Sequence, residues 1–271
     1  MDTQKPRFAR AVRSVCTAVA MTGLAMASTT AAADSLMPDF DGAPNGWTTD
    51  RFQPVGFVDV GSYQGRDDVL QIRIDSSTDA ANRPAGQQSS FYNTQGMQHA
   101  VSGGAGSVLA ADLYIERAWA DANNGFVRTD MWGVMSSGEA VAAYTILGFT
   151  NHGGAARLRA WDGDLAAGWV DLDNVVIQYG AWNALSIVFT GSAFEYYVNG
   201  LLAYVDGTTG GSTGFSAAIM QAYNFAEGSL GTPATVPYAA HWANTVPVPE
   251  PVSLAVLMIG LAGIALSRRR F

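Results

Sequence analysis

The sequence predicts an all-β domain, an antiparallel β-sandwich or jelly roll, flanked by two terminal segments of different character. Apolar and polar residues alternate along most of the middle of the chain, as they do in half-buried strands. Of the 22 acidic residues between positions 34 and 250 only five are glutamate, the acid that helices favour. Glycine-rich stretches separate the alternating segments at short spacing, which is typical of a sandwich and not of a parallel α/β sheet.

About ten strands are expected from this alternation. Leu70, Ile72 and Ile74 share one strand face, with polar residues between them. Leu113 and Ile115 alternate in the same way with their polar neighbours. By the same criterion, further strands are predicted at 125–135, 142–150, 156–161, 169–178, 185–190, 217–225 and 238–243.

The clearest local prediction is a hairpin over residues 194–205. Asn199-Gly200 lies between two apolar segments, and this pair supplies the two positive φ angles of a type I′ turn. The run Trp182-Asn-Ala-Leu-Ser-Ile, followed by Tyr196-Tyr-Val-Asn-Gly, resembles the concanavalin A-like lectin and glucanase superfamily, which is similar in this to laminin-G-type domains. The resemblance implies a jelly roll of two curved antiparallel sheets. It implies no single activity, because this fold carries hydrolases, lectins and structural modules.

Charge and cysteine content exclude several classes of function. Residues 34–250 contain eight arginines and no lysine against 22 acids, a formal charge of −14 that repels nucleic acid and anionic membranes. Cys16 is the only cysteine. It lies in the N-terminal segment described next, so the domain is expected to have neither a disulfide framework nor a thiol nucleophile nor a cysteine-ligated zinc site.

Residues 1–33 have the three parts of a signal peptide. A basic stretch with Lys5 and three arginines precedes an apolar core at 15–27, and the small residues 31–33 form a cleavage site before Asp34. The sequence therefore predicts export of the chain, with the export machinery and signal peptidase as partners.

The C-terminal segment, 246–271, combines a proline-rich motif, a short apolar run and a basic end. The run at 252–266 would span roughly 22 Å as a helix, close to the ~30 Å of a bilayer core, and the arginines after it would stay on the cytoplasmic side. The pattern resembles the PEP-CTERM sorting signal of Gram-negative bacteria; an ordinary tail anchor is the alternative. The matching residues are Pro249, Glu250, Pro251, Arg268, Arg269 and Arg270.

The resemblance implies recognition by an exosortase, a membrane-embedded processing enzyme. It also implies export across the inner membrane of a Gram-negative bacterium, transient anchoring through the predicted membrane helix 252–266, and then a cell-surface or extracellular location. The domain between the two terminal segments is expected at 34–245.

A glycosidase on this fold would need a pair of carboxylates. The Glu-x-Asp-x-Glu strand of the glucanase branch has no counterpart here. The nearest match is Asp112 and Glu116, on one strand face about 13 Å apart, and Asp171 and Asp173 are about 7 Å apart on another. For both pairs a solvated strand face is the favoured interpretation.

Calcium is the cation that an aspartate-rich, lysine-free domain would bind best. Asp162 and Asp164 are the best short candidates, although a plain Asp-Gly turn is favoured. His99, His152 and His241 have no metal-binding spacing.

Four aromatic residues could stack on sugar rings, although packing in the core is the favoured interpretation for each. Trp161 is the best candidate, because alternation places it on the same strand face as Arg157 and Arg159. The other three are Trp132, Tyr144 and Trp169.

The sequence therefore favours an exported, non-catalytic surface or matrix protein that is sorted through its tail and able to bind carbohydrate or exopolysaccharide. One alternative is a glycoside hydrolase or polysaccharide lyase on the same fold. The other is a purely structural matrix protein.

Overall fold

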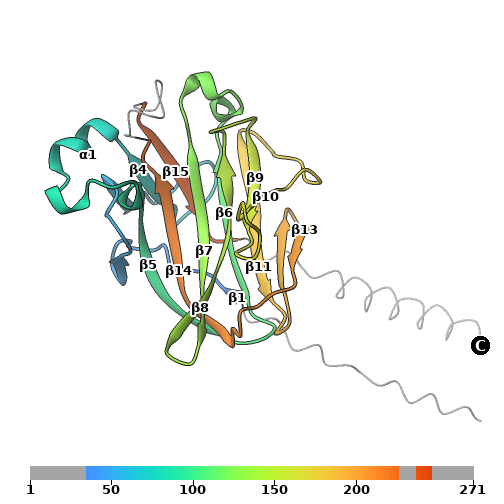
Figure 1. Ribbon diagram of the computed structural model, residues 1–271. Coiled ribbons are helices and arrows are strands. Elements are labelled where there is room, and N and C mark those ends of the chain that lie inside the picture. Colours follow the sequence, from blue (N-terminus) through green and yellow to red (C-terminus); the bar gives the residue numbers. More distant parts are fainter. Residues whose placement is uncertain (1–34, 226–235, 246–271) are drawn as a thin grey trace, which may run out of the picture. The chain divides into compact units, whose positions relative to one another are not determined.

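The computed structural model describes residues 35–225 and 236–245, and these form two stacked β-sheets (Figure 1). We name each sheet after a central strand. In spatial order the β6 sheet contains β13 (Leu201–Asp206), β12 (Phe194–Val198), β11 (Ala181–Phe189), β6 (Val108–Ile115), β15 (Tyr238–Ala243), β4 (Leu70–Ile74) and β3 (Gly56–Asp59), with β1 (Ser35–Leu36) paired to β6. The β7 sheet contains β10 (Trp169–Asp171), β9 (Arg157–Trp161), β8 (Ala140–Thr150), β7 (Arg128–Ser137), β14 (Gly214–Tyr223), β5 (Thr94–Gly103) and β2 (Trp47–Thr49).

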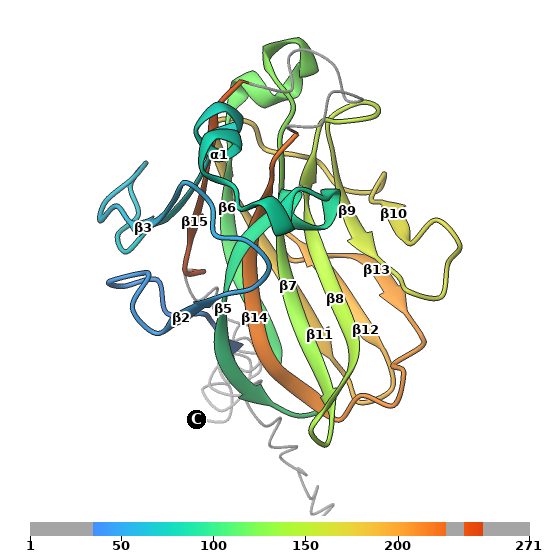
Figure 2. The ribbon, with the colours of Figure 1, turned by 60° about the vertical axis from the view of Figure 1, so that its left-hand side comes forward.

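The ladders between these strands are antiparallel, apart from the short one between β1 and β6. Figure 2 shows β5, β14, β7 and β8 side by side, with β11 and β12 behind them. The predicted antiparallel β-sandwich is therefore confirmed for the described part of the chain.

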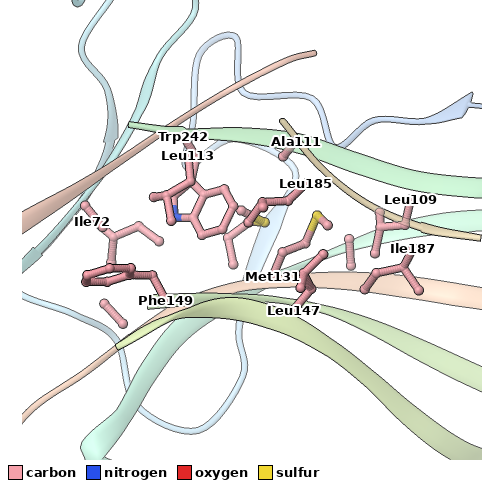
Figure 3. Packing of buried hydrophobic residues seen from close by; sticks show 14 of the residues in the cluster. Ile72, Leu109, Ala111, Leu113, Met131, Leu147, Phe149, Leu185, Ile187 and Trp242 are labelled. Carbon is pink, nitrogen blue, oxygen red and sulfur yellow. The ribbon is translucent and has the colours of Figure 1, made fainter. Parts of the chain in front are cut away.

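The core lies between the two sheets and follows the predicted alternation. Leu113 and Ile72 of the β6 sheet face Met131 and Leu147 of the β7 sheet, and all four are fully buried (Figure 3). Trp242 is also fully buried, and its Nε1 donates a hydrogen bond to Thr129 Oγ1 of the opposite sheet at 3.0 Å. This bond satisfies the indole N–H inside the core and links the sheets.

The predicted hairpin is confirmed, because Asn199 and Gly200 have φ angles of +51° and +78° between β12 and β13. One predicted strand is much shorter than expected, and four strands were not predicted. The strand expected at 169–178 is β10, which ends at Asp171. The four that were not predicted are the short strands β1, β2 and β3 and the ten-residue strand β5.

Helical segments are few and short. Helix α1 (Ser76–Asn82) begins after Asp75, whose carboxylate accepts hydrogen bonds from the Ser77 and Thr78 amides at 3.1 Å, as an N-cap does. The other helical segments are single 3₁₀ turns: η1 (Ala85–Gln87), η2 (Ser90–Asn93), η3 (Arg117–Ala120) and η4 (Ala122–Asn124).

The terminal predictions lie outside the described residues. This applies to the signal peptide at 1–33, the sorting segment at 246–271 and its helix at 252–266. Within the described ranges, none of the helices has the length and hydrophobicity to cross a bilayer.

The outward face of the β7 sheet departs from the usual polar-out pattern. Residues 129–135 of β7 are all buried, although only alternate ones can face the core. The outward-facing Trp132, Ile146 and Ile219 form a second apolar cluster, separate from the core, with Trp161 and Trp169 packed against it. A sheet face that is apolar on its solvent side is a candidate binding surface.

Candidate functional site

Strand register sets two parallel rows of side chains on the outward face of the β7 sheet. The first row, here the aromatic row, runs across five strands: Trp169, Trp161, Ile146, Trp132 and Ile219. The second, here the polar row, lies two residues away along each strand: Arg159, Gly148, Asp130 and Gln221. The strands that carry them, β10, β9, β8, β7 and β14, lie side by side in the sheet.

The aromatic row holds its rings at steep angles to one another. The Trp161 and Trp169 rings are 5.1 Å apart and inclined at 73°, and Trp132 packs edge-on against Tyr144 at 5.8 Å. Gly168 packs directly against the Trp161 ring, since a Cβ atom added at residue 168 would lie 2.3 Å from the indole. Such contacts fix the ring orientations, so the row is a preformed platform.

Asp130 is the central member of the polar row and is completely buried. Its Oδ2 accepts hydrogen bonds from Arg128 Nε at 2.8 Å and from Gln221 Nε2. Gly148 leaves room for this carboxylate, because a Cβ at 148 would lie 2.3 Å from Asp130 Oδ1. Asp130 Oδ1 and Gln221 Oε1 have no hydrogen-bond partner in the part of the chain that the structure describes. Buried polar atoms of this kind are costly and often mark a site that a ligand or water completes.

Three arginines lie over tryptophan rings of the aromatic row. The Arg159 guanidinium carbon lies 3.6 Å from the centre of the Trp169 ring, and that of Arg128 lies 5.0 Å from it. Arg51 packs over Trp132 at 4.6 Å. Burial lowers the pKa of Arg159 to about 10, which still leaves the side chain charged at neutral pH.

These side chains enclose a hollow of about 290 Å³. Its lining is aromatic and basic, with no carboxylate: Arg51, Arg128, Trp132, Tyr144, Ile146, Trp161 and Trp169. A second hollow of about 210 Å³ shares Tyr144 and Trp161 with the first and is also lined by Asp164, Asp206 and Thr208. The two hollows therefore share Trp161 and Tyr144 as lining residues, and we call the pair of hollows the track.

Asp162 and Asp164, the predicted cation ligands, lie beside Asp206 at the end of the second hollow. One carboxylate oxygen from each of the three lies within 4.8 Å of the others. Burial, together with the charges of Asp162 and Asp164, raises the pKa of Asp206. Such an oxygen set could hold a hard cation such as calcium. Asp206 was not predicted, because it ends β13 of the β6 sheet and meets Asp162, which follows β9 of the β7 sheet, only where the two sheets pack together. Asp41, Asp59 and Asp68 form another, more exposed acidic group.

The catalytic candidates Asp112 and Glu116 lie elsewhere, on the outward face of the β6 sheet. Asp112 Oδ2 accepts a hydrogen bond from Arg66 Nη2 at 2.6 Å, and Glu116 Oε1 accepts one from the Tyr63 hydroxyl at 2.6 Å. Tyr63 also stacks on His241, with ring centres 3.8 Å apart. Loop 60–69, which supplies Tyr63 and Arg66, thus engages both carboxylates.

Asp171 and Asp173 belong to the region of the β7 sheet, so the structure does not bring the two predicted acid pairs together. Asp171 lies on the edge strand β10, where its Oδ1 accepts a hydrogen bond from Arg157 Nε at 2.8 Å. Asp173 is exposed after the end of that strand. Neither residue lines either hollow.

Residues 247–270 match the family model of the PEP-CTERM protein-sorting motif. Signals of this kind mark exported proteins that are anchored at the membrane or cell surface, and the motif implies exosortase processing. The match spans the six tail residues named above, from Pro249 to Arg270, and confirms the predicted sorting signal.

Several solved structures are similar to the chain. A Bacillus licheniformis β-glucanase is 9% identical, with 77% of this chain and 97% of that chain covered and a TM-score of 0.45. A prokaryotic β-1,3-1,4-glucanase from a mouse hindgut metagenome is 10% identical, with 77% and 97% covered and a TM-score of 0.44. A carbohydrate-binding module from Bacillus subtilis is 12% identical, with 73% and 92% covered and a TM-score of 0.38. Among curated proteins, none matches this chain.

Proposed function

We propose that this protein is an exported surface or matrix protein that binds a glycan along the track on the β7 sheet without cleaving it. The observation that carries the proposal is the outward-facing hollow itself. It is lined by fixed aromatic rings, among them Trp132, whose buried Nε1 has no partner among the described residues. Two residues away along the same strands, Asp130 Oδ1 and Gln221 Oε1 also lack partners there. Sugars present both apolar ring faces and hydroxyl groups, so they complement such a surface.

The lining of the first hollow has no carboxylate, which supports binding without hydrolysis; Asp164 and Asp206 of the second hollow belong to the candidate cation site. Glycosidases place two carboxylates on either side of the scissile bond, roughly 5 to 9.5 Å apart. Asp130, the partner of the lining residue Arg128, is completely buried and is held by Arg128 and Gln221. A carboxylate that is buried and held by a guanidinium is poorly placed to act as a nucleophile or an acid.

The sorting part of the proposal assigns a path to the precursor. The signal peptide at 1–33 directs the chain across the inner membrane of a Gram-negative bacterium and is removed by signal peptidase. The helix at 252–266 then anchors the chain until an exosortase recognises Pro249-Glu250-Pro251. The domain at 34–245 is released to the cell surface or into an exopolysaccharide matrix.

Trp161→Ala tests the binding site. The full-length chain, purified in non-ionic detergent, is screened against immobilised polysaccharides, and the dissociation constant of the best ligand is measured. We expect the substitution to weaken binding at least about tenfold, because removal of a central aromatic contact typically costs more than ~1.4 kcal/mol.

Trp182→Ala is the matched control, because Trp182 is also a half-buried indole but lies on the outward face of the β6 sheet. It should change the affinity less than about twofold. If Trp161→Ala binds as tightly as the wild type, or if only unfolded Trp161→Ala protein is obtained while Tyr144→Ala folds and binds normally, the site lies elsewhere. Release of reducing ends or unsaturated sugars by the wild type would replace the binding proposal with the hydrolase or lyase alternative.

A further inference from the structure

The hollow is basic although the protein is acidic. Residues 34–250 carry a formal charge of −14, yet four of their eight arginines lie on or beside the outward face of the β7 sheet: Arg51, Arg128, Arg157 and Arg159. Two of these line the hollow, and no carboxylate does. At 0.15 M salt the Debye length is about 8 Å, so the acids of the β6 sheet's outward face are largely screened from a ligand here.

Three of the four arginines have an acidic partner. Arg51 pairs with Asp50 at 3.5 Å, and Arg128 and Arg157 pair with Asp130 and Asp171, each at 2.8 Å. Arg159 is the fourth.

Arg159 makes neither a salt bridge nor a hydrogen bond with the described residues, and its buried Nε has no partner. It is 8% exposed, and its charge is compensated by stacking on Trp169 and by more distant acids. A desolvated, unpaired guanidinium is costly, and an oxyanion nearby would offset that cost.

The paired arginines also keep donors free for a ligand. Arg128 uses Nε for Asp130, and its terminal nitrogens make no hydrogen bond within the described ranges. Arg51 reaches Asp50 only at 3.5 Å, which is an ion pair but too long for a good hydrogen bond. Both guanidinium groups lie over aromatic rings of the hollow, Arg128 over Trp169 at 5.0 Å and Arg51 over Trp132 at 4.6 Å.

We infer that the ligand of this hollow is an acidic glycan, whose sugar ring lies on the aromatic row and whose oxyanion is bound by Arg51 and Arg128. Arg159 adds positive potential from beneath Trp169. The oxyanion is a uronate carboxylate or a sulfate ester, since planar guanidinium groups bind either one through paired hydrogen bonds. This inference rests on the proposed glycan binding and narrows its ligand class.

The experiment compares three polysaccharides at 0.15 M salt: polygalacturonate, dextran sulfate and neutral dextran. The full-length protein is used in non-ionic detergent, and affinity is measured by retardation in gels that contain each polysaccharide. We expect one of the two acidic polymers to bind at least about tenfold more tightly than dextran. Polygalacturonate as the tighter ligand identifies a carboxylate, and dextran sulfate identifies a sulfate ester.

Arg51→Gln and Arg73→Gln form a matched pair. Each removes one positive charge and one 3.5 Å contact with a neighbouring aspartate, but Arg73 lies on β4 of the β6 sheet. We expect Arg51→Gln to weaken binding of the acidic polymer about tenfold and Arg73→Gln to change it less than about twofold. Arg128→Lys keeps the charge and the partner of Asp130, and should still weaken binding several-fold because lysine loses the paired geometry.

Three outcomes overturn the inference. Equal weakening by Arg51→Gln and Arg73→Gln would mean that only net charge matters. If Arg128→Lys and Arg51→Gln, each as a single variant, both bind the acidic polymer as tightly as the wild type does, neither arginine binds the oxyanion. If the wild type binds a neutral polysaccharide but neither acidic polymer, and Trp161→Ala abolishes that binding, the inference of an acidic ligand is wrong and the proposed glycan binding stands. If Trp161→Ala binds every polymer as tightly as the wild type does, the proposed function itself is wrong. Unsaturated uronates released from polygalacturonate would support the acidic ligand and replace binding with cleavage.

Discussion

Asp112 is a buried carboxylate, and its burial disfavours the ionised form more than the neighbouring Arg66 favours it. It is 3% exposed, one of its oxygens has no partner among the described residues, and burial raises its pKa to about 6 despite the Arg66 guanidinium beside it. A raised folded-state pKa means that the folded protein binds this proton more tightly than the unfolded chain. The contribution to stability is therefore present at about pH 4 and is lost as the pH rises towards 6 and above.

We expect Asp112→Asn to remove this loss. Wild-type stability, measured by urea unfolding, should fall between pH 4 and 7 by an amount of order 2–3 kcal/mol from this group, and the variant should lack that part of the slope. Asp173→Asn removes the same charge from an exposed loop position and should keep the slope. Parallel pH profiles for the wild type and Asp112→Asn would show that Asp112 is ionised without penalty.

Some residues of the candidate site could be grouped together from the sequence alone, and others could not. Trp161, Arg157 and Arg159 share a strand face, so alternation was enough to group them. Asp130 and Gln221 are 91 positions apart and meet only because β7 pairs with β14. Alternation of Arg128, Asp130 and Trp132 against Thr129 and Met131 was a usable signal that β7 has a functional outward face.

At the scale of elements, the local patterns predicted most of the strands. They missed some strands, and they did not predict which strands pair with each other. The long strand β5 escaped prediction because its alternate residues are not clearly apolar: Gln95, Met97 and His99 point one way, and Gly96 and Gln98 the other. Strand β10 stops at Asp171 because the chain leaves the sheet edge after three paired residues. Sheet order depends on pairings between segments distant in sequence, which local periodicity does not encode.

The hairpin between β12 and β13 offers a test of an element that the sequence did predict. Gly200 has a φ of +78°, a region that a β-branched residue adopts only with strain. We expect Gly200→Val to lower the free energy of unfolding by about 1–3 kcal/mol. Gly207→Val is the control, since Gly207 follows β13, has no positive φ and has open space around its Cα. Equal stability of the two variants in urea would contradict a type I′ turn.

At the scale of the molecule, the outward faces of the two sheets differ in what covers them. The β6 sheet's face is covered by loop 60–69, whose Tyr63 and Arg66 engage Glu116 and Asp112. The β7 sheet's face has an open hollow lined by aromatic and basic side chains. The proposed glycan site therefore lies on the β7 face.

The sorting tail is tested on the whole protein in its own cell. We expect mass spectrometry of the mature surface or extracellular species to find no peptide from 252–266, because the PEP-CTERM motif matched at 247–270 implies exosortase processing. Replacing Arg268, Arg269 and Arg270 with Ala should weaken membrane retention of the precursor, since on the proposed path these charges would hold the end of the predicted helix on the cytoplasmic side. The same three positions changed to Lys keep the charge and should retain the precursor normally. A mature species that still contains residues 252–266 would make the tail a permanent anchor.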